Sequence, residues 1–433
     1  MAIVREWVSW LTVLALSVMI FTLPFSKSAV EICIAVAFAL WILNRALSYD
    51  SRSSLIRIFK PVDTKLNLPV YLFIIAAFLS VLLSTSISLS LRGFFSKLLK
   101  GVVLYFIVAE IINDRKKLNA VMVTMVLSML LIGADGIFQY VTTVGDFLRK
   151  YPQAGRITAS FSSANGFGAW LIVMLPLLYG IFYALIINKP KKAIPVILWF
   201  LAGVLIICLS SALMACLVLT RSRGAWTGLA FAAIFFMIVN MVVKKNRIFL
   251  ISIVFILLAS LIAIPFFIHM TIEGQDPVFA IKQSLVLIMQ NMDIVRTNLW
   301  REALLIIRDF PVFGCGLNAY SIVAPRYKSG LLEAGIYPHN SYLQMAAETG
   351  IVGLLSFIFV IVSLFKASIT NVRKIKDTFY GCILAGLLTG LFAFLVHSFF
   401  DVNFYALQLA NLMWFMMGLI IAVQKTALKE EGA

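Results

Sequence analysis

One histidine of this chain is placed for proton transfer. His339 lies in the tripeptide Pro338-His339-Asn340, where the proline stiffens the approach and the asparagine amide can orient the ring. Imidazole is the side chain that can take up or release a proton near neutral pH without special tuning. The other histidines, His269 and His397, lie near the ends of apolar runs, where a packed or interfacial role is typical. His339 is therefore the candidate general base, although the residues alone are equally compatible with a structural histidine.

Several arginines stand in recognisable settings before His339. Arg156 lies in GRITASFSSANGFG, Arg221 and Arg223 lie in TRSRGAWTGL, and Arg296 and Arg301 lie in RTNLWREALLIIRDFPVFGCGLNAY. A guanidinium group keeps its charge at any relevant pH, and its planar fork of donors suits phosphate oxygens. The alternative for each is an arginine that extends from a helix end to the membrane interface. The arginines and the histidine together predict a site for an anionic substrate.

The acidic and cysteine residues do not form a pattern typical of a metal site. The sequence has no Asp-x-Asp pair, and the five cysteines lack the paired spacing of a zinc or disulfide framework. The acidic residues expected on the outer side are dispersed along the chain: Glu273, Asp276, Asp293, Asp309, Glu333 and Asp401. We therefore expect no metal and no cofactor, with arginines compensating the charge of the substrate.

The composition requires a membrane scaffold around these residues. Hydrophobic residues make up 62% of the 433 positions and charged residues only 13%, which lies far outside the range of a soluble domain. The formal net charge of +17 would suggest nucleic acid in a soluble protein. In a membrane protein, basic loops that fix the orientation are the first expectation, so we expect no nucleic-acid partner.

Apolar runs predict an all-α polytopic protein with about twelve transmembrane helices. The runs cover residues 7–24, 29–47, 68–86, 98–112, 118–140, 164–187, 195–219, 225–243, 248–270, 341–365, 378–400 and 404–424. More than half of the 36 lysines and arginines fall on one side of the membrane under this assignment. Basic residues concentrate in cytoplasmic loops, so both termini are expected in the cytoplasm and the long polar loop outside, in the periplasm.

The predicted spans divide the chain into three parts. Residues 1–270 hold the first nine helices, residues 271–340 form a periplasmic loop, and residues 341–433 hold the last three helices and a short cytoplasmic tail. Asp276-Pro277 looks like the start of one helix in the loop. A second, amphipathic helix is expected along the membrane surface, because apolar residues recur at helical spacing at Val295, Leu299, Ala303, Ile306 and Phe310.

Three segments, TRSRGAWTGL, RTNLWREALLIIRDFPVFGCGLNAY and YPHNSYLQMAAETGIVGLL, resemble the O-antigen ligase family, whose superfamily includes O-antigen polymerases and protein O-glycosyltransferases. The resemblance implies a GT-C-type membrane fold and metal-free transfer of a glycan from undecaprenyl diphosphate to an acceptor sugar. It implies that Arg223 and Arg296 bind the diphosphate and that His339 faces the acceptor. Other residues of the same motifs would bind substrate: Arg156, Arg221, Arg301 and Asn340. One departure is that Ala159 and Ala164 replace the Gly and Pro of similar sequences, which leaves the role of Arg156 open.

The expected function is an inner-membrane O-antigen ligase that joins lipid-carried polysaccharide to a lipid A-core sugar by an inverting displacement, since no positioned nucleophile is evident. The main alternative is a polymerase of O-antigen or exopolysaccharide that extends a second lipid-linked glycan. A protein O-glycosyltransferase usually carries more sequence after the last helix than the short tail here. A transporter of lipid-linked glycan would need a polar path through the bilayer.

Overall fold

The computed structural model describes residues 2–48, 60–142, 145–148, 155–187, 193–243, 294–328 and 337–432. These residues form helices and no β-strand, which confirms the all-α prediction. Within the described part, eight helices are long and apolar enough to cross a membrane. They are α1 (Ala2–Thr22), α2 (Lys27–Ala46), α7 (Arg115–Thr142), α8 (Ala164–Ile187), α9 (Ala193–Leu219), α15 (Ser341–Val372), α16 (Thr378–His397) and α17 (Leu407–Glu430). The protein is therefore a multi-pass membrane protein.

Most of the expected spans coincide with helices. Two shorter apolar helices, α4 (Asn67–Leu82) and α10 (Arg223–Val243), occupy two further predicted runs. The run predicted at 98–112 belongs to a longer helical segment made of α5 (Ile87–Gly93), the π-helical η1 (Phe94–Leu99) and α6 (Lys100–Ile111). The run at 248–270 and the helix expected at Asp276-Pro277 lie outside the described residues. The described residues therefore account for fewer membrane-spanning helices than the twelve that the sequence predicted.

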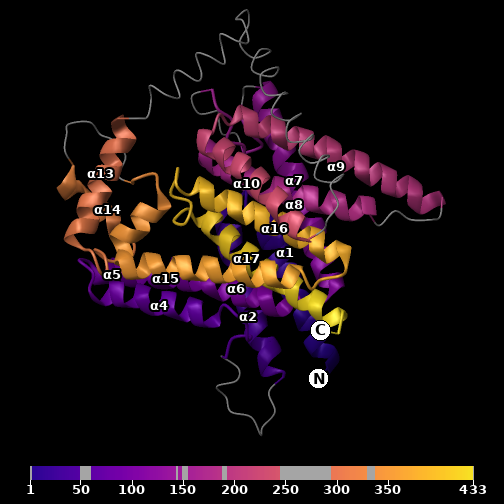
Figure 1. The fold of residues 1–433 in the computed structure, drawn as a ribbon, viewed down its shortest axis with the longest axis horizontal. Helices are drawn as coiled ribbons and strands as arrows, with labels where there is room; N and C mark the ends of the chain where they lie inside the picture. The colour runs from indigo at the N-terminus through magenta and orange to yellow at the C-terminus, as the bar shows by residue number, and fades with distance from the viewer. Residues whose placement is uncertain are drawn as a thin grey trace, which may run out of the picture.

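Ion pairs and a hydrogen bond hold the N-terminal and C-terminal helices together at one end of the bundle. Lys117, at the start of α7, lies 3.5 Å from Glu6, and Arg115 lies 3.1 Å from Asp377 in the turn after α15. Glu431 accepts a 2.8 Å hydrogen bond from the backbone N–H of Asp377. Helix α15 runs from this end to the opposite one, where α13 (Ile294–Asp309) and α14 (Tyr320–Val323) lie (Figure 1). The start of α15, which follows His339, is therefore remote from both termini.

A break in α15 holds the segment after α13 in place. Gly350 has φ 65° and ψ −173°, so it interrupts a helix that the sequence predicted as continuous. Backbone groups freed by the break are satisfied by the neighbouring loop: the Cys315 N–H donates to the Ala347 carbonyl (2.9 Å), and the Ile351 N–H donates to the Pro311 carbonyl (2.9 Å). Buried backbone groups need such partners, because none is available from lipid. The break therefore fixes α13 relative to the first turns of α15.

Buried carboxylates organise other connections of the same end. Asp135 in α7 accepts hydrogen bonds from the Ser160 hydroxyl (2.6 Å) and the Phe147 N–H (2.7 Å). Gln139, one turn later, accepts from the Thr158 N–H (2.8 Å). These bonds draw the segment after α7 into the bundle, where residues 157–161 are buried. Three further acidic residues in the apolar helices are also partnered: Glu31 by Lys100, Glu110 by Arg45, and Glu348 by Asn318 and Gln344.

Candidate active site

His339 and Asp401 form the centre of the site. The His339 Nδ1 atom lies 3.2 Å from Asp401 Oδ1, in the turn between α16 and α17. A carboxylate only accepts hydrogen bonds, so Nδ1 carries the proton of the neutral ring and Nε2 is left to accept one. The His339 side chain is 42% exposed and that of Asp401 only 16%. An incoming molecule can therefore reach the imidazole while the carboxylate stays behind it.

The surroundings of Asp401 keep it ionised. Burial acts to raise the pKa of this carboxyl, but the hydrogen bond from His339, the nearby His397 and the N–H of Val402 (2.8 Å) outweigh it. The net result is a pKa below the ordinary value of 3.8. Asp401 therefore supplies a fixed negative charge to the imidazole at neutral pH.

The residues after His339 fix its position. Asn340 is buried and caps α15, since its side-chain oxygen accepts hydrogen bonds from the N–H groups of Tyr342 and Leu343 (3.0 Å each). The Ser341 hydroxyl donates to the Asp401 carbonyl at 2.7 Å. An N-cap of this kind stabilises a helix start by about 1 kcal/mol. The described role of Asn340 is thus to position its neighbours, and substrate binding by its amide stays a prediction.

Arg156 is anchored beside the start of α10. Its Nε donates to the Thr220 carbonyl at 2.8 Å, and its Nη2 donates to Asn165 Oδ1 at 2.6 Å. Thr220 begins the turn that carries Arg221, which is exposed with φ 49°, and Arg223, which is exposed as the first residue of α10. The motifs GRITASFSSAN and TRSRGAW, which are distant in sequence, therefore meet at this turn.

Three other arginines act electrostatically on Arg156. Burial and then the positive charges of Arg221, Arg223 and Arg296 lower the pKa of the Arg156 guanidinium, and the charge of Asp401 opposes them. Like charges repel one another, and a bound anion would offset the repulsion that Arg156 experiences. We call Arg156, Arg221, Arg223 and Arg296 the arginine cluster.

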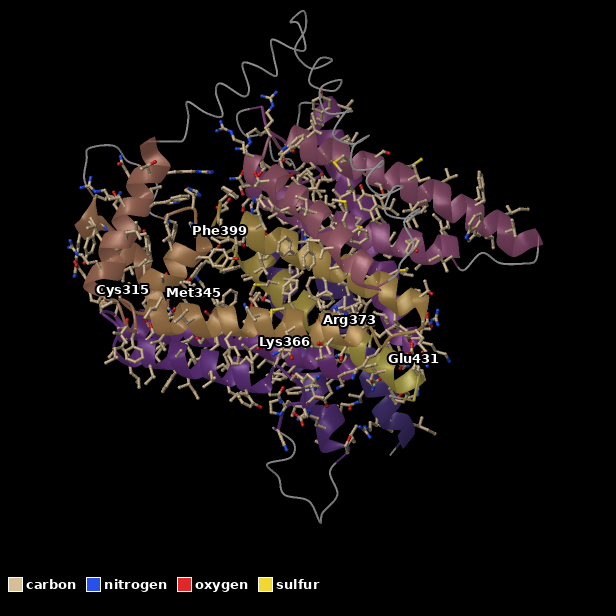
Figure 2. All side chains as sticks on the ribbon, in the orientation of Figure 1. Cys315, Met345, Lys366, Arg373, Phe399 and Glu431 are labelled. Carbon is tan, nitrogen blue, oxygen red and sulfur yellow. The ribbon has the colours of Figure 1, made fainter. Side chains whose placement is uncertain are left out.

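The arginine cluster adjoins the His339–Asp401 pair. A methyl group built on Gly224, the second residue of α10, would lie 2.8 Å from Cβ of Phe400 and 3.2 Å from Cδ2 of His397. Only a residue without a side chain lets α10 approach the end of α16 this closely. Figure 2 shows nitrogen-bearing side chains facing the space between α13 and the turn marked by Phe399.

Arg301 is placed differently from the cluster. It is exposed on α13, and its five-residue separation from Arg296 corresponds to a rotation of about 140° around the helix. Arg296, and not Arg301, is among the charges that lower the pKa of Arg156. A substrate contact by Arg301 stays a prediction that needs a ligand large enough to reach around α13.

Sequence reasoning did not single out Asp401, which it counted among dispersed acids. The available signal was position, because Asp401 is the acidic residue between the apolar runs at 378–400 and 404–424.

His397 agrees with its predicted packed role: it is 1% exposed, and its Nδ1 accepts a 2.8 Å hydrogen bond from Asn403. Among the described residues, no group of three His, Cys, Asp or Glu side chains could hold a metal ion.

The chain is similar to known proteins over part of its length. The family model described as O-Antigen ligase matches residues 208–358, a range that holds Arg221, Arg223, Arg296 and His339. A Haemophilus influenzae protein described as uncharacterized is 29% identical over 201 residues, which cover 43% of this chain and 49% of that protein. The chain thus spans about half the length of the curated relative it matches. Residues 208–358, with three arginines of the cluster and the histidine of the candidate site, are thus similar to the O-antigen ligase family.

Proposed function

We propose that this protein is an O-antigen ligase-like glycosyltransferase that moves a polysaccharide from undecaprenyl diphosphate to an acceptor sugar of lipid A-core. The observation that carries the proposal is the arginine cluster beside the His339–Asp401 pair. A cluster of fixed positive charges suits a diphosphate, and an exposed imidazole backed by a carboxylate suits a sugar hydroxyl.

In the proposed reaction, the acceptor hydroxyl attacks the anomeric carbon of the donor glycan. The hydroxyl proton passes to Nε2 of His339 as the new carbon–oxygen bond forms. The bond between the anomeric carbon and the diphosphate breaks, and the diphosphate leaves with the bonding electrons. Arg223 and Arg296 offset the charge that develops on the leaving group, with Arg156 and Arg221 adding to the positive field. Asp401 stabilises the imidazolium ion that His339 becomes.

The proposed displacement is direct, so the anomeric configuration is inverted. A retaining reaction would need a carboxylate or another nucleophile placed against the anomeric carbon. Asp401 is instead engaged with His339 and with the N–H of Val402. Determining the anomeric configuration of donor and product by NMR tests this step, and retention would contradict it.

The proposal places the site in the periplasm of a bacterium, in a GT-C-type protein with twelve spans in the inner membrane. Two observations support this orientation. Arg45, Arg115 and Lys117 lie at the end of the bundle that holds both termini, and basic residues favour the cytoplasmic side. Helix α13 and the start of α15, which follows His339, lie at the opposite end (Figure 1). The ninth span would come from residues 248–270, and residues 271–340 would form the periplasmic loop.

No metal or other cofactor takes part in the proposed mechanism, because the guanidinium groups compensate the diphosphate. Transfer is expected to continue in excess chelator. Loss of transfer in chelator, with recovery on addition of magnesium, would contradict this part of the proposal.

The decisive experiment supplies purified protein with a lipid-linked polysaccharide and one acceptor at a time. A ligase joins the glycan to lipid A-core, and the product is seen as a ladder on a gel. Longer glycans that stay on the lipid carrier would instead identify an O-antigen or exopolysaccharide polymerase. A glycosylated peptide would identify a protein O-glycosyltransferase. Accumulation of lipid-linked glycan across a proteoliposome membrane without a new glycosidic bond would identify a transporter. The His339→Ala variant serves as the inactive control.

A further inference from the structure

A pocket with two lysines lies beside the turn that carries Asp401. It has a volume of about 300 Å³ and includes Phe404 and Tyr405, which follow Asp401 in this turn. Its polar wall comes from α2, η1, α6 and α17, and is formed by Glu31, Lys97, Lys100 and Asn411. We call it the lysine pocket. The arginine cluster borders α10 and α13 instead, and Figure 1 shows α16 and α17 between α10 and the helices α2 and α6.

The lysine pocket presents hydrogen-bond donors. Lys97 in η1 and Lys100 at the start of α6 are three residues apart, so they share one face of the helical run. Each ammonium group has three donors, of which Lys97 uses one on Asn318 (2.6 Å) and Lys100 uses one on Glu31. Asn411 is 3% exposed, and its buried amide nitrogen has no partner among the described residues. Donors in excess of acceptors suit an anion with several oxygens, such as a phosphate.

Two carboxylates face this region, and both are already engaged. Glu31 is paired with Lys100. Glu348 lies near Lys97 and accepts hydrogen bonds from the Asn318 N–H (2.7 Å) and the Gln344 amide (3.1 Å). The remaining donors of the two lysines are therefore available to a ligand.

An apolar cavity continues from the lysine pocket into the bundle. The two share Lys97, Phe404, Tyr405 and Ala410. The inner part, which we call the apolar slot, is lined by side chains typical of a hydrocarbon-binding surface: Phe73, Leu98, Met345, Phe357, Met413 and Trp414. A polar mouth of lysines over an apolar slot has the amphipathic character of a lipid with an acidic head group.

We infer that the lysine pocket and the apolar slot bind a phosphate-bearing lipid. Its phosphate contacts Lys97, Lys100 and Asn411, and the first part of its hydrocarbon chain lies against Phe357 and Trp414. The assignment of this lipid to the acceptor side rests on the proposed function, since the arginine cluster is assigned to the donor diphosphate. The turn from Asp401 to Tyr405 then separates the two lipid head groups, with His339 beside it.

The η1 segment supports a binding role for this surface. A π-helical turn is less stable than an α-helical one, and such turns are frequent at functional sites. Here it lies directly before Lys100 and includes Lys97. The irregular turn and the unpartnered Asn411 amide are two separate features of one pocket, and a bound phosphate would give that amide a partner.

A photoreactive lipid tests this inference on the full chain in phosphatidylcholine nanodiscs. The probe is phosphatidic acid with a diazirine in one acyl chain, and labelled peptides are mapped by mass spectrometry. We expect labelling of the peptide that contains Met413 and Trp414, with competition by unlabelled phosphatidic acid. Equal labelling by the matching diacylglycerol, which lacks the phosphate, would overturn the inference. Complete displacement of the probe by inorganic phosphate at the same concentration would also overturn it, because the acyl chains of the lipid would then add nothing to its affinity.

Variants connect the labelling to the lysines. The double variant Lys97→Gln/Lys100→Gln is expected to reduce labelling about tenfold, and Asn411→Leu is expected to reduce it in the same direction. The matched control is Lys366→Gln/Lys374→Gln, which removes two exposed lysines, one in the C-terminal part of α15 and one just after this helix. Figure 2 marks this end of α15 by Lys366 and Arg373. If the double variant fails to fold, Lys97→Gln alone serves, because this side chain is exposed. Undiminished labelling in folded lysine variants would overturn the inference.

A further variant separates this inference from the proposed function. Arg223→Ala is expected to keep the labelling, because Arg223 belongs to the arginine cluster and not to the lysine pocket. Loss of labelling in Arg223→Ala would contradict the separation of the two sites. Labelling as expected without glycan transfer to any acceptor would keep the lipid site and remove the proposed function.

Discussion

The imidazole of His339 and the carboxylate of Asp401 lie 3.2 Å apart although 62 positions separate them in the chain. They meet because the start of α15 is bonded to the turn after α16: the Ser341 N–H donates to the Ser398 carbonyl at 2.8 Å. The hydrogen bond selects the tautomer in which Nε2 is free to accept a proton. Any proton transfer by His339 should therefore depend on Asp401 without a direct contact between Asp401 and substrate.

Replacing Asp401 by Asn should lower the turnover number about 100-fold and leave the KM for the donor nearly unchanged. The amide removes the negative charge that stabilises the imidazolium ion, but it does not alter the arginine cluster. Asp401→Glu should restore part of the rate. The measurement is initial-rate transfer at varied donor concentration, with the melting temperature as a check of folding. Asp309→Asn is the control, because Asp309 is an acid at the same end of the bundle that bonds Arg308 and Tyr327. A changed donor KM with an unchanged turnover number would argue against this role.

Replacing Arg223 or Arg296 by Ala should raise the donor KM about tenfold or more, and Lys should recover only part of the loss. The reason is that a guanidinium group can hold two phosphate oxygens at once, whereas an ammonium group acts as a point charge. Arg308→Ala provides a control on α13, since Arg308 is exposed and pairs with Asp309. Binding of a water-soluble lipid diphosphate analogue, followed by calorimetry, checks the prediction without turnover. Equal affinity in Arg223→Ala and wild type would exclude a diphosphate contact there.

Stability should depend on Asp401 down to low pH. The pKa of Asp401 is lowered in the folded protein, so its contribution is present above the ordinary value of 3.8 and is lost as pH falls through the lower folded value. The difference in melting temperature between wild type and Asp401→Asn should therefore not shrink between about pH 8 and pH 5, and should shrink only below about pH 4. Thermal unfolding in detergent across this range measures it. A difference that shrinks between pH 7 and pH 5 would mean that the carboxyl titrates there.

The helices could be predicted from the sequence because each apolar run is long enough to require one in lipid. The pairing of His339 with Asp401 could not, since it depends on how α15 and α16 pack. Arg156 is a similar case. Its motif departs from the family pattern at Ala159 and Ala164, yet the structure places its guanidinium on the Thr220 carbonyl.

The break in α15 was also hidden from sequence reasoning. A single glycine such as Gly350 is common in a membrane helix and does not by itself predict a break. The positive φ is required by a partner distant in sequence, because the segment that begins at Pro311 pairs with the backbone on both sides of Gly350. Local propensity contains no information about that partner.

Replacing Gly350 by Ala should destabilise the protein by about 2 kcal/mol or more. The new methyl group would lie 2.1 Å from the Val312 carbonyl oxygen, and φ 65° is unfavourable for any residue with a side chain. The matched control is Gly381→Ala in α16, where a methyl group would have no described atom within 4 Å. Alanine there should be neutral or stabilise the helix by up to about 1 kcal/mol. Thermal unfolding of the two variants in the same detergent measures the difference.

Because the break fixes the segment after α13, Gly350→Ala should also weaken donor binding through Arg296, whereas Gly381→Ala should not. Equal melting temperatures and equal donor affinities in the two variants would show that the loop does not depend on the break.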